Sequence, residues 1–68
     1  MHIEIWSCEG TEFRIEIFRS AFGAVGGRWG YIGKWRRLRD GFKGASSEHS
    51  KSVEDALTVN KMNAYPHR

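Results

Sequence analysis

The alternation of apolar and polar residues at the start of the chain predicts two β-strands. Residues 2–8 read HIEIWSC and residues 12–20 read EFRIEIFRS, and in both stretches an isoleucine or phenylalanine recurs at every second position. A period of two with β-branched and aromatic residues is typical of a strand with one buried face. The residues between them are Glu9, Gly10 and Thr11, so we expect a three-residue hairpin loop with Gly10 at its centre. This loop would pair the two strands with Ile5 opposite Ile15.

A third strand is expected over residues 29–39, after a glycine-rich connection at residues 21–27. Its two faces are both mixed in character. One face carries Trp29, Tyr31, Gly33, Trp35, Arg37 and Arg39, and the other carries Gly30, Ile32, Lys34, Arg36 and Leu38. We expect Ile32 and Leu38 to point inward, because they match the aliphatic face of the first hairpin. Asp40-Gly41 then predicts a turn.

The last third of the chain predicts a polar loop followed by one helix. Residues 44–52 are polar and have the composition of a loop. Ser52 precedes two acidic residues, which is typical of an N-cap and of the first turn of a helix. We expect the helix over about residues 53–64, with Pro66 ending the segment.

These elements predict a single small α+β domain over residues 1–68. Its architecture is a three-stranded antiparallel β-meander, with room for a short fourth edge strand at Phe42-Lys43, and one C-terminal α-helix packed on one face. The expected covered face carries Ile3, Ile5, Phe13, Ile15 and Ile17. In its order of elements the chain is similar to the three-stranded DNA-binding modules of integrase arms and of plant AP2 proteins, a similarity of layout that no family motif accompanies.

Composition narrows the classes of protein to which the chain can belong. Its 68 residues include one cysteine and three scattered histidines, so we expect no internal disulfide, no metal site and no cofactor. The sequence contains no apolar run long enough to span a bilayer, and its start lacks the features of a secretory signal. We therefore expect a cytoplasmic protein that does not bind membranes.

Positive charge is concentrated in the expected third strand and its flanks. The net charge of the chain is +3, yet residues 28–43 hold six basic residues against Asp40. Guanidinium and ammonium groups pair with phosphates, and flat rings stack on bases. The sequence thus predicts a nucleic-acid-binding accessory or regulatory protein, for DNA or RNA, with an exposed basic and aromatic sheet face. The predicted binding residues are Trp29, Tyr31, Lys34, Trp35, Arg36, Arg37 and Arg39.

Two other hypotheses use the same residues. The first is a protein-binding adaptor or inhibitor that docks on a larger, acidic partner through the aromatic face and the glycine-rich loop, with Phe22 and Val25 as apolar contacts. The second is a homodimer that buries Trp29 and Trp35. An enzyme is not expected, because neither Cys8 nor the histidines have a partner at a spacing that identifies a general base.

Overall fold

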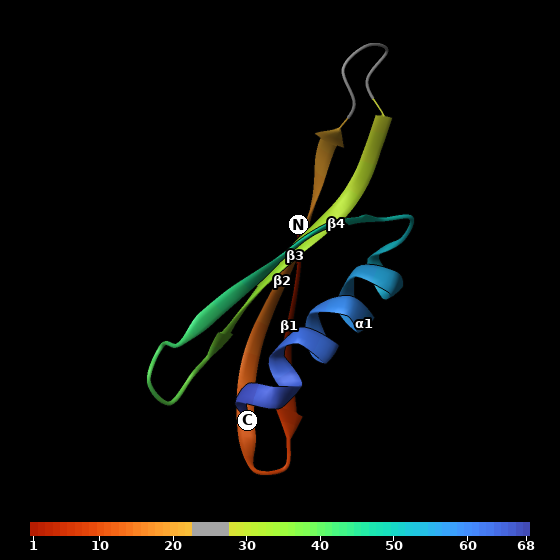
Figure 1. Cartoon of the computed structure of the whole chain (residues 1–68). Helices are drawn as coiled ribbons and strands as arrows, with labels where there is room; N and C mark the ends of the chain where they lie inside the picture. The colour runs from red at the N-terminus through yellow and green to blue at the C-terminus, as the bar shows by residue number, and fades with distance from the viewer. Residues whose placement is uncertain (23–27) are drawn as a thin grey trace.

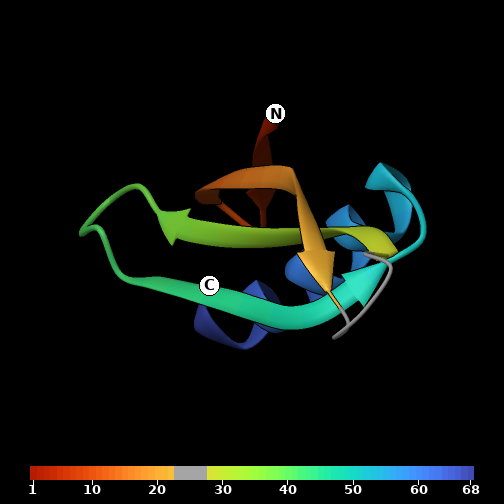
Figure 2. The ribbon, with the colours of Figure 1, turned by 90° about the horizontal axis from the view of Figure 1, so that it is seen from above.

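Four antiparallel strands and one helix make up the described part of the chain. A computed structural model describes residues 1–22 and 28–68, with only the backbone at Phe22 and Ser47. The elements are β1 (His2–Cys8), β2 (Thr11–Phe22), β3 (Arg28–Arg37), β4 (Lys43–Ser50), α1 (Val53–Ala64) and the 3-10 turn η1 (Tyr65–His67). The strands form one twisted sheet in the order β1-β2-β3-β4, and α1 lies along one side of it (Figures 1 and 2). The predicted α+β meander with a C-terminal helix on one face is confirmed.

The hairpin between β1 and β2 turns through two residues. Glu9 and Gly10 both have positive φ, 48° and 83°, which is the pattern of a type I′ turn. This turn pairs Glu4 with Ile15 across the two strands. The predicted three-residue loop and the Ile5–Ile15 pair are wrong by one residue, because the type I′ turn fits the twist of the strands and needs no third loop residue.

The shift in register changes which side of β1 faces the helix. Trp6 lies opposite Phe13, and their rings stack with centroids 5.5 Å apart. Ile3 and Ile5 point to the other face and are 46% and 54% exposed. The expectation that both isoleucines lie under the helix is therefore wrong. The stacked aromatic pair takes the inner position because it buries more apolar area than an isoleucine would.

The core lies between α1 and the inner face of the sheet. Its buried apolar residues are Phe13, Ile15, Ile17, Trp35, Ala56 and Ala64. Trp35 takes the inner position on β3 for which Ile32 was predicted. Ile32 alternates with it onto the opposite face, and Leu38 is 44% exposed after the end of β3. The predicted inward side of the third strand is thus reversed, because one tryptophan fills more of the space under the helix.

Two glycines make room for the large groups of this core. A Cβ atom on Gly33 would overlap Asn60 Nδ2 of α1 and would lie 2.5 Å from Ile17 Cδ1. A Cβ atom on Gly44 would lie 2.5 Å from Trp35 Cζ2. The close approach at Gly33 lets α1 pack against the backbone of β3.

The fourth strand is much longer than the sequence predicted. Residues 44–50, expected in a loop, belong to β4, which pairs with β3 through a register irregularity between Tyr31 and Gly33. Polar residues fit here because β4 is an edge strand with one open side. The helix follows as expected over Val53–Ala64, and Ser52 Oγ accepts a hydrogen bond of 3.1 Å from the backbone N–H of Asp55.

Candidate nucleic-acid interface

The sheet face opposite α1 carries four basic side chains on adjacent positions. Arg14 of β2 lies opposite Arg36 of β3, and Arg36 lies opposite Lys43 of β4. Lys34 stands two residues along β3 from Arg36, on the same side of the sheet. Side chains directly opposite one another across strands have Cβ atoms about 5 Å apart. We call this surface, made of Arg14, Glu16, Lys34, Arg36 and Lys43, the basic face.

These side chains surround a shallow hollow of about 580 Å³. Glu16 is the carboxylate on its rim, and its oxygens lie 3.2 Å from Arg14 Nε and 3.5 Å from Lys34 Nζ. One carboxylate cannot neutralise four cations, so the hollow keeps a positive potential. The Arg14 and Lys34 side chains are 43% and 59% exposed, and an anion in solution can reach both.

Beyond the sheet, β2 and β3 continue as a two-stranded ribbon. Residues 20–22 pair with residues 28–30 past the ends of β1 and β4, and this part projects away from α1 (Figure 1). Trp29 is 61% exposed there, and the guanidinium of Arg19 lies 5.2 Å from its ring centroid. The ribbon therefore presents an exposed aromatic ring beside a positive charge.

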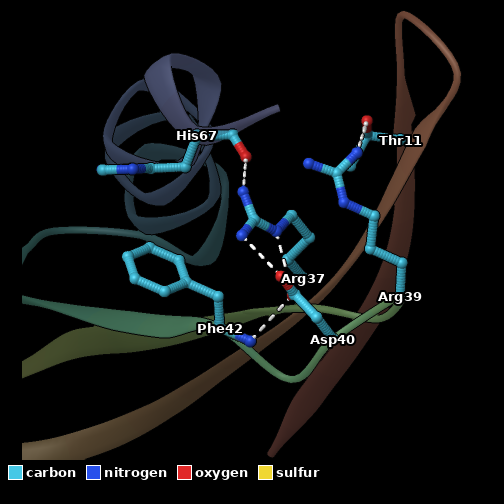
Figure 3. A network of polar contacts seen from close by, with 6 residues as sticks. All are labelled: Thr11, Arg37, Arg39, Asp40, Phe42 and His67. Carbon is cyan, nitrogen blue, oxygen red and sulfur yellow. Dashed lines mark hydrogen bonds and ion pairs between the residues drawn. The ribbon is translucent and has the colours of Figure 1, made fainter.

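Arg37 lies on the helix side and is held by three hydrogen bonds. Its Nε and Nη2 donate to the carboxylate of Asp40 at 2.9 and 2.7 Å, and its Nη1 donates to the backbone carbonyl of His67 at 2.5 Å (Figure 3). The hydrogen bonds from Arg37 and from the backbone N–H of Phe42 lower the pKa of Asp40 to about 2. The same Asp40 hydrogen bond raises the pKa of Arg37. Arg37 thus ties the β3–β4 hairpin to the end of the chain.

The predicted aromatic residues of β3 all alternate onto the helix side of the sheet, opposite the basic face. Trp35 is 4% exposed and stacks on His67, with ring centroids 5.3 Å apart. Tyr31 is half-buried against the core. The expectation that both stand exposed opposite the helix is wrong, because their side chains point toward α1. Arg39 lies in the β3–β4 hairpin, where its Nη1 donates to Thr11 Oγ1 at 3.4 Å (Figure 3).

Of the seven predicted binding residues, the structure brings Lys34 and Arg36 together on the basic face. Arg14 and Lys43 complete that face and were not among the predicted binding residues. The alternation in β2 carried a signal for Arg14, since it stands between Phe13 and Ile15, which point inward. Lys43 could be placed only once β4 was known to pair with β3.

The burial of Trp35 removes one contact residue from both the protein-docking and the homodimer hypotheses. The docking hypothesis relied on the glycine-rich loop, of which residues 23–27, including Val25, and the side chain of Phe22 lie outside the described residues. Both hypotheses also relied on Trp35, which lies in the core of a single chain.

Comparison of the chain with protein-family models, with curated proteins and with solved structures found no match. Within residues 1–22 and 28–68, no helix is long and apolar enough to cross a membrane. The same residues contain no cluster of three or more His, Cys, Asp or Glu side chains that could hold a metal ion.

Proposed function

We propose that the chain binds nucleic acid through the basic face, with the phosphate backbone as the main ligand. The observation that carries the proposal is the grouping of Arg14, Lys34, Arg36 and Lys43 around one hollow on the uncovered side of the sheet. Phosphate groups favour such a surface because each cation that pairs with one releases a condensed counterion.

The aromatic contribution is smaller in this proposal than the sequence predicted. Trp35 and Tyr31 pack against the core, which leaves Trp29 as the predicted stacking residue with an exposed ring. Trp29 lies on the side of β3 opposite the basic face, so in this proposal it is a separate contact at the ribbon. Its ribbon is two strands wide, a width that the major groove of duplex DNA can admit. Contacts to phosphates position a protein but carry no sequence information. We therefore expect low sequence specificity.

A titration of labelled nucleic acid, followed by fluorescence anisotropy at low salt, tests this proposal. Replacing Lys34 and Arg36 together with glutamine should weaken binding by about tenfold or more, since each phosphate contact contributes to affinity. Replacing Glu16 with glutamine should strengthen binding, because it removes the one carboxylate of the hollow and frees Arg14 and Lys34. Duplex and single-stranded DNA and RNA should each be titrated.

The control is a double variant of equal charge away from the basic face. Arg39→Gln with Lys51→Gln removes two exposed positive charges from the loops at the two ends of β4. This control should lose much less affinity than the Lys34/Arg36 variant, because neither Arg39 nor Lys51 lines the hollow of the basic face. Equal loss of affinity in the two double variants, or no binding of any nucleic acid by the original chain, would refute the proposal.

A further inference from the structure

We propose that two copies of this chain pair through the open edge of β1, antiparallel, with Ile5 of one copy opposite Ile5 of the other. The result would be a symmetric dimer with one continuous eight-stranded sheet. This inference concerns contacts between copies of the chain and does not rest on the proposed nucleic-acid function.

The open side of β1 presents backbone groups ready for pairing. Leu38 N donates to Glu12 O at 3.0 Å, so Glu12 directs its backbone groups toward β3. Ser7 lies opposite Glu12 across the hairpin and must therefore direct its own N–H and C=O away from β2. In an antiparallel ladder every second residue directs its backbone groups to the same side, so the N–H and C=O of Ile5 and Ile3 also point away from β2. Three successive outward positions thus offer both a donor and an acceptor.

The two edges of the sheet differ in how they are protected. β4 has a register irregularity opposite Tyr31 and Gly33, and such bulges discourage the pairing of edges. β1 pairs regularly with β2 over its whole length, His2–Cys8, and contains neither lysine nor proline. It therefore lacks three of the devices that keep an edge strand from pairing with another chain, namely lysine, proline and a β-bulge.

Charge and symmetry favour one register for the paired strands. A pairing centred on Ile5 uses all of His2–Cys8 and sets Glu4 opposite Trp6 of the second copy. A shift that centres it on Glu4 would set the two Glu4 carboxylates directly opposite, which is unfavourable. Lys61 Nζ lies 2.8 Å from Glu4 Oε2 and 5.8 Å from the centroid of the Trp6 ring. In the Ile5 register, Lys61 would also lie beside Glu4 of the second copy.

The same pairing would cover exposed apolar side chains. Ile3 and Ile5 are 46% and 54% exposed on the face opposite α1, where they border the basic face next to β2. Because the twofold axis would run perpendicular to the sheet, both helices would lie on one side of the dimer. Both basic faces would lie on the other. One seven-residue strand is a small contact, so we expect a reversible dimer.

Sedimentation equilibrium over a concentration series, without nucleic acid, tests the pairing. The original chain should show a monomer–dimer equilibrium, and Ile5→Lys should weaken it by about tenfold or more, because two ammonium groups would face each other. Ile3→Lys is the matched control: it changes an exposed isoleucine of the same strand, but faces Ser7 of the second copy, so its effect should be smaller. Circular dichroism checks that both variants keep the fold.

Cysteine cross-linking tests the register. In a Cys8→Ala background, Ile5→Cys should form an intermolecular disulfide, because hydrogen-bonded partners have Cα atoms about 5.5 Å apart, within disulfide range. Ile3→Cys should not, because its two copies would be about 14 Å apart. A monomer at every concentration would overturn the proposal, and the open edge of β1 would then be available for a strand of another protein. Equal cross-linking of Ile3→Cys and Ile5→Cys would overturn the register.

Discussion

Trp35 and Trp29 show how two tryptophans of one strand take different roles. Trp35 lies over Gly44, and Phe13, Phe42 and His67 surround its ring. Trp29 stands on the part of β3 that extends past the helix and is 61% exposed. A tryptophan beneath α1 has enough neighbours to be buried, whereas one on a two-stranded ribbon has no layer to cover it. The position along the strand, more than the residue type, decides the role.

Gly33 is a residue at which a single added carbon should destabilise the fold. A Cβ atom there would overlap Asn60 Nδ2, and the buried amide has little room to move since Asn60 is 1% exposed. We expect Gly33→Ala to lower the free energy of unfolding by about 1–3 kcal/mol. Chemical denaturation of the purified chain measures this value.

The Asn60→Ala background provides the control for that substitution. Removing the amide gives the added methyl group space, so Gly33→Ala should cost less in this background than in the original chain. The same cost in both backgrounds would show that the contact between Gly33 and Asn60 is not the cause.

The first hairpin and α1 illustrate what the sequence could predict at the scale of elements. Periods of two placed β1 and β2, and the N-cap at Ser52 placed α1. The register of the first hairpin could not be read, because Glu9 takes a positive φ that is uncommon for a residue other than glycine. Either register gives β1 one plausible inner face. Packing against Phe13 decides between them, and this contact forms only in three dimensions.

The full length of β4 could not be predicted, for a related reason. Its residues are mostly small and polar, and the pattern of such a segment does not distinguish a loop from an edge strand. Its strand character comes from pairing with β3 and from the contact between Gly44 and Trp35. Without β4, the grouping of Lys43 with Arg36 and the burial of Trp35 could not be foreseen.

The hairpin between β3 and β4 should lose stability in acid. Asp40 has a pKa of about 2 in the folded chain, below its ordinary value of 3.8, because Arg37 and the Phe42 N–H donate to its carboxylate. The unfolded chain therefore takes up this proton at a higher pH than the folded chain. The stabilisation is fully present above about pH 5 and is lost as the pH falls through 4 toward 2.

Denaturant unfolding at a series of pH values checks this contribution. Asp40→Asn should flatten the dependence of the unfolding free energy on pH between about pH 5 and pH 2, relative to the original chain. Arg37→Gln should flatten it in the same range, because it removes the largest cause of the lowered pKa. A curve for Asp40→Asn that runs parallel to that of the original chain would contradict the role assigned to this pair.

At the scale of the whole molecule, the fold places the hydrophobic core and the basic face on opposite sides of the sheet. α1 covers one side of the sheet (Figure 2), where Phe13 and Trp35 lie in the core, and the basic face lies on the other side. The charge count foresaw that β3 would bring positive charge to one region. It could not foresee that the aromatics and Arg37 would turn to the helix side, since that depends on which face the helix covers.

The salt dependence of nucleic-acid binding tests the central claim most directly. For duplex DNA, the slope of log Kobs against log salt concentration changes by about 0.9 for each phosphate contact. The variant that carries Lys34→Gln and Arg36→Gln should therefore have a slope shallower by about 2 than the original chain, whereas Arg39→Gln with Lys51→Gln should leave it nearly unchanged. Equal slopes for the original chain and the Lys34/Arg36 variant would contradict the claim that the basic face binds phosphates.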